Sequence, residues 1–405
     1  MAAGWSELPK DLLWSIATCL VTYTDQVRFT CVCTSWRSVL PTIEVRSHAW
    51  LLLPRNNDTN KEYEKFYSLH ERKVHYLEVP DEVLSKKFRG SSHSWLVSIE
   101  DSPKISLFNP ITRVQIALPP RYKFPDVRKY CAKKFDTEYA LEPYDGQKNT
   151  YFEAASHVHN SFLDKLVLSS SPTSSKAPNC MVAAIYGSHC NLAYCKVGDK
   201  RWTCIAKGMM GYDDAIFHDQ KLYAVTFTSY VEVFDLSASP KLVDTIEPPQ
   251  EEGYPQRRYL VKTSIGLLQV QRHTKNTGDR KTYLYRTTFF NLYMYEPSSR
   301  SWCKVENIGE NVLFLGLNTS ISIASSDLHG YKGNHIYFTH NFLDFHEFGV
   351  KGGYDIGVYD LDSRSVQSLP CHDIEKRWLW PTPIWYIHNP EDFIEQDKDA
   401  TTKLN

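Results

Sequence analysis

The hydrophobic residues of this chain follow two different periods, and the change falls near residue 48. Between 8 and 36, apolar side chains recur three and four positions apart, with a short break at 22–25. This spacing predicts two or three short amphipathic helices. Pro9 suits the start of the first helix, because a proline lacks the N–H that would have no partner there. Pro41 ends the last one, because a proline cannot continue a helix.

Beyond residue 48 the periodicity changes to that of strands. A short unit recurs, in which an apolar strand ends in an aromatic residue followed by a polar residue and a turn. The aromatic positions of these units are Tyr67, Phe108, Tyr194, Phe234, Tyr295 and Tyr359. A base period of about 40 residues, sometimes lengthened by an insertion, is typical of a four-stranded propeller blade. The pattern therefore predicts an all-β propeller after the helical start.

Individual blades can be read from the strand pattern. The clearest is 214–246, where four apolar strands are separated by polar turns. The other candidate blades are 49–80, 88–119, 166–206, 259–305 and 320–369. We therefore expect about six blades, and a seventh would fit in the long interval between Phe108 and Tyr194.

One apolar strand near the C-terminus, 384–387, has no blade of its own. A propeller whose ring stayed open would leave strand edges and apolar faces uncovered. We therefore expect strand 384–387 to complete the first blade beside 50–53.

Composition narrows the class of protein. The chain has 10 Trp, 25 Tyr and 19 Phe, together 13% of its 405 residues, which is far too many for a disordered protein. Its 46 Lys and Arg balance 47 Asp and Glu, so bulk charge does not favour nucleic acid or an anionic membrane as a partner. No apolar run is long enough to predict a transmembrane helix, and the first residues lack a secretory signal pattern. The ten Cys form no CxxC pair, so we expect reduced, buried cysteines in a cytoplasmic or nuclear protein.

The helical segment carries more large apolar side chains than so small a bundle can bury. Either they bind a partner or they pack on the rest of the chain, and spacing alone leaves both interpretations open. The residues themselves resemble the F-box motif: Leu8-Pro9-x-Asp11-Leu12-Leu13-x-x-Ile16-x-x-x-Leu20, then Asp25-x-x-Arg28-Phe29-x-x-Val32-Cys33-x-x-Trp36-Arg37-Ser38. Thr30 departs from the pattern, since many relatives carry Arg there.

The F-box resemblance implies a binding partner. In that family the motif binds a Skp-type adaptor, which links the protein to a cullin scaffold and a ubiquitin-conjugating enzyme. The positions that match the adaptor-contacting residues are Leu8, Pro9, Leu12, Leu13, Ile16, Leu20, Val32 and Trp36.

A second resemblance concerns the rest of the chain. The segments 107–113, 118–120, 313–320, 333–339 and 355–361 are similar to those of plant F-box proteins with a KIB-type β-propeller. The resemblance implies an α+β multidomain protein: an all-α F-box at 1–45 and an all-β propeller at 48–388. The remaining tail, 389–405, is polar and charged, so we expect it to be mobile. In this family the propeller is taken to recruit the substrate. The long inserts at 121–150, 248–258, 273–281 and 341–353 are the first candidates for contact with that target.

Candidate chemistry is sparse. His157 and His159 could place two metal ligands on one strand face, but no further ligand stands at a suitable spacing, so we interpret them as alternating strand or turn histidines. We interpret the acidic pairs 213–214 and 251–252, and the basic patches 257–258 and 275–281, as solvated loop charges. No nucleophile, zinc or phosphate-binding motif of known spacing is present. We therefore expect no catalytic residue, cofactor or metal.

Together these observations predict the substrate-recognition subunit of a Skp–cullin–F-box ubiquitin ligase, located in the cytoplasm or the nucleus. The F-box would bind the adaptor, and the propeller would recruit an unknown target protein. Two alternatives remain open. One is a propeller enzyme or small-ligand binder with a helical N-terminal extension, and the other is an F-box protein that takes no part in a ligase.

Overall fold

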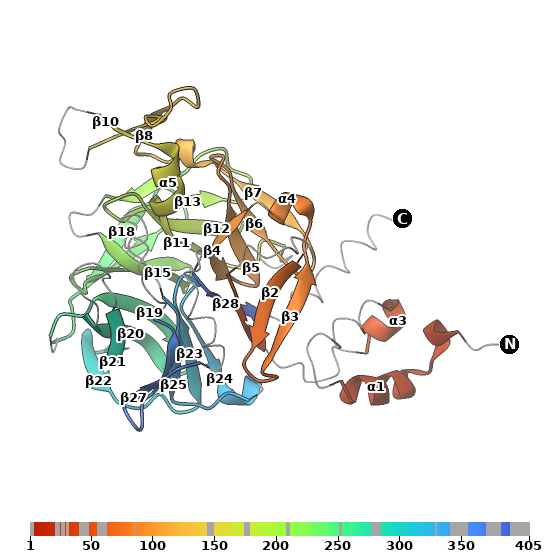
Figure 1. Cartoon of the computed structure of the whole chain (residues 1–405). Coiled ribbons are helices and arrows are strands. Elements are labelled where there is room, and N and C mark those ends of the chain that lie inside the picture. The colour runs from red at the N-terminus through yellow and green to blue at the C-terminus, as the bar shows by residue number, and fades with distance from the viewer. Residues whose placement is uncertain are drawn as a thin grey trace.

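The structure is a computed structural model of the chain. It describes residues 4–20, 25, 29, 32–39, 48–54, 63–84, 86–143, 150–173, 179–207, 211–250, 253–276, 285–328, 330–340, 355–369 and 382–388. These residues form a short helical segment followed by a predominantly β body (Figure 1). The body contains seven sheets: five of four strands, one of five and one of three.

The N-terminal helices are η1 (Trp5–Glu7), α1 (Lys10–Thr18) and α3 (Thr34–Arg37). Pro9 lies directly before α1, as the sequence predicts. The second predicted helix is interrupted: the chain is helical at Asp25 and Phe29, forms a turn at Val32, and begins α3 only after Cys33, which is fully extended. Apolar spacing continues across this break, which is why the pattern did not reveal it.

The first sheet joins the two ends of the β body. It consists of β1 (His48–Leu52), β2 (Tyr63–Ser68), β3 (Lys73–Glu78) and β28 (Ile384–His388), in the order β28-β1-β2-β3. Strands β28 and β1 are antiparallel, and their register runs from His48 opposite His388 to Leu52 opposite Ile384. The prediction that the last strand completes the first blade is confirmed.

Four further sheets are antiparallel meanders in chain order. Each blade predicted between 88 and 305 corresponds to one of them. Their strands are β4 (Lys87–Ser92), β5 (Trp95–Ile99), β6 (Ile105–Phe108) and β7 (Gln115–Leu118); β11 (Leu163–Leu168), β12 (Met181–Tyr186), β13 (Asn191–Lys196) and β14 (Thr203–Ala206); β15 (Tyr212–His218), β16 (Lys221–Thr226), β17 (Val231–Asp235) and β18 (Lys241–Ile246); β19 (Arg257–Thr263), β20 (Gly266–Asn276), β21 (Tyr285–Glu296) and β22 (Ser301–Val305).

The five-stranded sheet differs from the predicted blade 320–369. It contains β23 (Asn311–Leu315), β24 (Ile321–Ala324), β25 (His335–Phe338), β26 (Gly357–Asp360) and β27 (Ser365–Gln367), in the order β24-β23-β25-β26-β27. Strands β23 and β25 are parallel and are connected through β24 and the short helix η4 (Ser325–Asp327). The predicted blade 320–369 therefore began too late and omitted β23. The prediction paired only antiparallel strands that follow one another in the sequence, whereas β23 pairs in parallel with β25.

The long interval between β7 and β11 holds a small three-stranded sheet. It follows η3 (Arg121–Lys123) and consists of β8 (Val127–Tyr130), β9 (Tyr139–Leu141) and β10 (Tyr151–Glu153), in the order β10-β9-β8. We call β8, β9, β10 and the connecting residues 131–138 the arm, because in Figure 1 it projects beyond the edge of the ring. Two other short helices are α4 (Asp81–Leu84), before β4, and α5 (Ala155–Ser161), before β11.

Helix α5 corrects the interpretation of His157 and His159 as strand or turn residues. In a helix, side chains two positions apart point in different directions. His157 pairs with Glu153 one turn earlier, at 2.8 Å, whereas His159 is buried. The two rings therefore do not share a face.

The apolar core lies between neighbouring sheets. One cluster joins β4–β7 to β11–β14, another joins β19–β22 to the five-stranded sheet, and a third includes β1, β23 and β28. The N-terminal helices have a separate small core of Leu13, Ala17, Phe29 and Val39.

Candidate functional site

The eight residues predicted to contact an adaptor lie in three different environments on the N-terminal helices. Leu13 is fully buried in their core. Leu8, Ile16, Leu20 and Trp36 are partly buried against that core, and Pro9, Leu12 and Val32 are exposed. The structure thus places all eight on one small helical unit and leaves three of them open to solvent.

Two tryptophans extend this exposed surface. Trp5 is 69% exposed and Trp14 is 49% exposed. The indole N–H of Trp36 donates to the backbone oxygen of Trp5 at 2.8 Å, and the Trp36 ring packs on Phe29 with centroids 4.6 Å apart. Trp36 therefore ties η1 to α3. Neither Trp5 nor Trp14 was among the predicted contact residues, although their size and their place in the helical segment could have suggested them.

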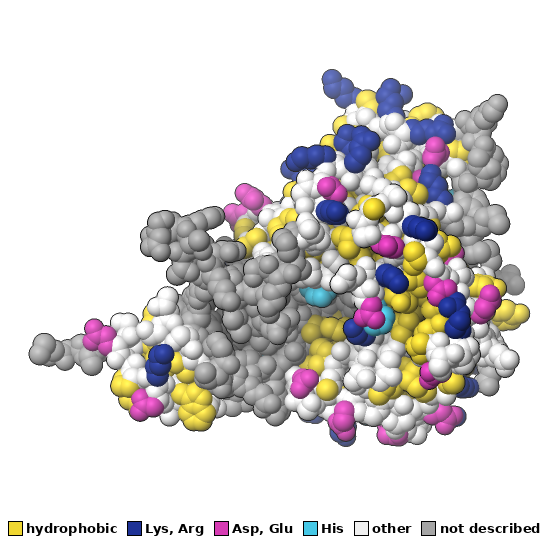
Figure 2. Space-filling model, turned by 180° about the vertical axis from the view of Figure 1, so that it is seen from behind, with side chains coloured by type: hydrophobic (Ala, Val, Ile, Leu, Met, Phe, Trp, Pro, Cys, Tyr) yellow, Lys and Arg dark blue, Asp and Glu magenta, His cyan; other side chains and the backbone are white. Residues whose placement is uncertain are grey.

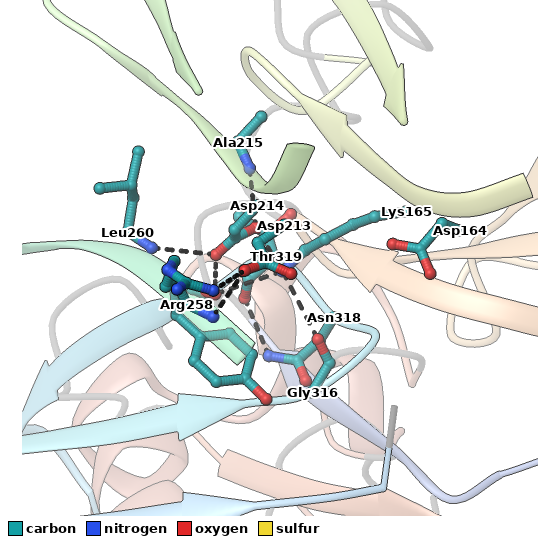
Figure 3. Close-up of polar contacts among 12 residues, drawn as sticks. Asp164, Lys165, Asp213, Asp214, Ala215, Arg258, Leu260, Gly316, Asn318 and Thr319 are labelled. Atoms are coloured by element: carbon teal, nitrogen blue, oxygen red, sulfur yellow. Dashed lines mark hydrogen bonds and ion pairs between the residues drawn. The ribbon is translucent and has the colours of Figure 1, made fainter. Parts of the chain in front are cut away.

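A second site, which is polar, lies inside the β body, where the first strands of several sheets meet. Strands β11, β15 and β19 each carry two consecutive charged residues within their first three positions: Asp164 and Lys165, Asp213 and Asp214, and Arg257 and Arg258. Figure 3 shows side chains from these strands and from the 316–320 segment converging on one another. We call these six residues, with Ser320, the axial cluster.

Lys165 and Asp214 form the centre of the axial cluster. The Lys165 ammonium lies 2.6 Å from Asp214 Oδ1 and donates to Ser320 Oγ at 3.2 Å. Asp214 also accepts hydrogen bonds from the backbone N–H groups of Ala215 and Leu260 and from the Ser320 hydroxyl, at 2.8, 3.1 and 2.6 Å. Burial lowers the pKa of Lys165, and the Asp214 carboxylate opposes that effect.

The two arginines connect the remaining carboxylates. Arg257 pairs with Asp164 at 2.5 Å, and Arg258 donates from its Nη1 and its backbone N–H to Asp213 Oδ2, both at 3.1 Å. The Arg258 Nε also donates to Ser229 Oγ at 2.6 Å. Burial raises the pKa of Asp213 to about 6, although the two guanidinium groups favour its charged form.

A neighbouring ion pair links β20 to the segment before β26. Arg272 is fully buried and lies 2.8 Å from Asp355 Oδ2. Its Nε donates to Thr287 Oγ1 at 2.8 Å, and its Nη1 donates to the Tyr259 hydroxyl at 3.2 Å. The guanidinium also lies 4.7 Å from the centroid of the Phe338 ring, a cation–π contact.

These contacts overturn the interpretation of residues 213–214 and 257–258 as solvated loop charges. All four lie in strands and are at least nine-tenths buried. Each side chain has a partner of opposite charge from a different sheet or strand, so the cluster is close to neutral. The pairs bridge β11, β15 and β19, and none of the six charged side chains is left as a free acid or base.

In the part of the chain that the structure describes, no three His, Cys, Asp or Glu side chains gather as a metal site would require. A pocket of about 370 Å³ lies between β21–β22 and β26–β27, lined in part by Asn291, Lys304, Tyr359 and the Glu306–Arg364 ion pair. None of the described helices has the length and apolar character needed to cross a membrane.

The described cysteines are free thiols in mixed surroundings. Cys180 and Cys195 are buried, whereas Cys19 and Cys303 are exposed, so the expectation of buried cysteines holds for only some of them. Burial raises the pKa of the Cys180 thiol, which makes it a poor nucleophile.

The sheets lie around a common centre, and a strand from the far end of the chain closes the ring (Figure 1). This arrangement is that of a β-propeller protein. Comparison with known families gives the particular kind. The model of the KIB1-4 β-propeller family matches residues 66–360, and the chain belongs to that family. Strands β1 and β28 lie outside the matched range, so the structure adds the strand pair that closes the ring.

Two curated relatives from Arabidopsis thaliana are similar over most of their length. F-box protein SKIP23 is 24% identical over 410 residues, covering 94% of this chain and 95% of that protein. F-box protein KIB4 is 22% identical over 384 residues, covering 89% of this chain and 92% of that protein. The resemblance to the KIB-type propeller family is thereby confirmed.

Proposed function

We propose that the protein is the substrate-recognition subunit of a Skp–cullin–F-box ubiquitin ligase. In this proposal residues 1–45 are the F-box and residues 48–388 the propeller, and its six blades are the sheets of four or five strands found among the described residues. The tail 389–405, expected to be mobile, lies outside the described residues. The names of the two F-box relatives, which match 94% and 89% of this chain, support this proposal.

The observation that carries the proposal is the exposed apolar surface of the N-terminal helices. Their own core is already filled by Leu13 and three other buried residues, so folding of the unit does not account for the exposed Pro9, Leu12 and Val32. Large exposed apolar residues on a small helical unit are typical of a surface that docks into a partner's hydrophobic groove. We assign the direct contacts to the exposed and half-buried residues, and to Leu13 the role of holding α1 in place.

In this function the chain performs no covalent chemistry. The adaptor and a cullin scaffold bring a ubiquitin-conjugating enzyme close, and the propeller holds the target beside it. Tethering raises the effective concentration of target lysines at a thioester carried by another subunit. Free cysteines on the described surface are compatible with the reducing compartments, cytoplasm and nucleus, where we place the protein.

Adaptor binding is the first test. Leu12→Asp should reduce capture of a recombinant Skp-type adaptor by about tenfold or more, because it places a charge in the apolar contact. Leu242→Asp is the matched control: Leu12 is 50% exposed on α1 and Leu242 is 48% exposed on β18. The Leu8→Ala, Pro9→Ala double variant should also lose the adaptor while the melting transition of the propeller stays unchanged. If the Leu12 and double variants bound as well as the control, the F-box assignment would be wrong.

A further inference from the structure

The arm has two faces of opposite character. Residues that lie opposite each other in β8, β9 and β10 form three cross-strand rows. Two of these rows are Val127, Leu141, Tyr151 and Tyr130, Tyr139, Glu153, and the third row, between them, is Lys129, Ala140, Phe152. Side chains opposite each other in neighbouring strands share a face, so the third row lies on the face opposite to the other two. Tyr139 and Leu141 are buried in the core that joins β4–β7 to β11–β14, with Val127, Tyr130 and Tyr151 packed against it. The inner face thus anchors the arm, and the outer face carries Lys129 and Phe152.

The outer face combines exposed aromatic rings with lysines. Phe152 is 55% exposed, and Lys134 Nζ lies 6.0 Å from the centroid of its ring. The neighbouring Phe135 is 85% exposed, in the turn between β8 and β9. Ala140, between Lys129 and Phe152 in the same row, is small and buried, so the two longer side chains stand above it on either side.

The lysines of the arm are not neutralised. Among the described residues, no carboxylate lies within ion-pair distance of Lys129, Lys133 or Lys134. Three nearby acids have other partners: Asp126 and Glu142 each lie 2.6 Å from Lys207, Glu142 also pairs with Arg128, and Glu138 accepts the backbone N–H of Ala155. A fourth, Asp136, is exposed in the turn between β8 and β9, so the three lysines of the arm outnumber the one acid there that has no such partner. Figure 2 shows Lys and Arg side chains gathered at the end of the molecule from which the arm projects.

We propose that the outer face of the arm, with Lys129, Lys134 and Phe152, together with Lys133 and Phe135 of the adjoining β8–β9 turn, binds an acidic segment of the target protein that carries an apolar or aromatic side chain. Charge complementarity selects the acidic residues, and the exposed rings supply the apolar anchor. The proposal rests on the proposed function, since it names the target-binding surface of the propeller. It favours protein over nucleic acid, because the cations are few and the whole chain has a net charge of −1.

The test uses the full-length protein and three fluorescent probes. They are a random copolymer of glutamate and tyrosine, poly-glutamate, and a single-stranded thymidine oligonucleotide. We expect the copolymer to bind most tightly, and its binding to weaken as salt rises from about 50 to about 300 mM. Phe152→Ala and the Lys129→Glu, Lys134→Glu double variant should each weaken copolymer binding by about tenfold.

Matched controls come from the β15–β18 sheet. Lys221→Glu with Lys241→Glu repeats the charge change on exposed lysines, and Phe227→Ala removes a ring that is 40% exposed. Equal loss in the control and arm variants would overturn the proposal, as would tighter binding of the oligonucleotide than of the copolymer. The arm variants should still capture the adaptor at wild-type level. Loss of adaptor capture in the Leu12 variant, without loss of copolymer binding, would show that the N-terminal helices and the arm bind their partners independently.

Discussion

Closure of the ring by the last strand makes a sharp stability prediction at Trp385. This side chain on β28 is fully buried, in a cluster that also contains Leu51 of β1 and Val312 of β23. Its ring meets those of Phe314 and Tyr337 edge-on, with centroids 5.2 and 6.0 Å apart. Trp385 therefore connects the first sheet of the ring, to which β28 belongs, with the last sheet.

The magnitude follows from the volume removed. Replacing a buried tryptophan by alanine costs about 3–5 kcal/mol, since the apolar contacts are lost and a cavity remains. The edge-on aromatic contacts add to the cost at the upper end of that range. In a protein of this size such a loss lowers the melting temperature by about 4–7 °C. Trp385→Phe should cost less, because it keeps most of the ring and the contact with Phe314.

The assay is thermal unfolding followed by circular dichroism and by calorimetry. Trp5→Ala is the control, because Trp5 is a tryptophan of the same chain that is largely exposed on η1. Removing the chain from residue 382 onward should destabilise all the sheets together, because it removes β28 entirely. Melting of Trp385→Ala within about one degree of wild type would refute the claim that β28 closes the ring.

Two further predictions concern buried charges. Lys165→Met and Asp214→Asn should each cost about 3–5 kcal/mol, because each leaves a buried charge without its partner, and the double variant should cost less than the sum; strict additivity in urea titrations would contradict the pairing. Burial and the nearby Arg121 lower the pKa of His159 to about 4 from 6.5, so the folded protein binds fewer protons than the unfolded chain between these values and stability falls as the pH drops through them. His159→Gln should remove this pH dependence. The stability that wild type loses between the two pKa values through His159 is at most about 3 kcal/mol, and about 1–2 kcal/mol after solvent screening. Asp213, with its pKa raised to about 6, contributes a slope of the opposite sign in both proteins, so the difference between them isolates His159; equal pH profiles would refute this assignment.

The strands could be predicted from the sequence because their signal is local. The blade 214–246 emerges as β15–β18 with nearly the predicted bounds, since alternation and turn residues define each strand within a few positions. Closure by 384–387 was also predictable, because a ring must cover its own edges. The parallel pairing of β23 with β25 was not, because it depends on a crossover that no turn signal marks.

The axial cluster could not be predicted, for a physical reason. A pair such as Asp213-Asp214 has the local composition of a solvated turn, and only a compensating charge makes its burial tolerable. That charge comes from distant positions: Arg258 is 45 residues from Asp213, and Arg257 is 93 residues from Asp164. A spacing pattern is recognised within one helix or strand. It therefore cannot identify charged partners that are far apart in the sequence and meet only in the folded ring.

The axial cluster and the closing strand together explain why recognition is best sought at the periphery of the molecule. Apolar contacts between sheets are strong but not directional, whereas the paired charges on β11, β15 and β19 fix how these inner strands align. A centre so fully paired offers an acidic or basic partner little to bind, because each group would first have to lose its present partner. The arm has the opposite character: one face is anchored in the core, and its outer lysines lack a carboxylate among the described residues. The two surfaces that we propose for binding, on the N-terminal helices and on the arm, both lie away from this paired centre (Figure 1).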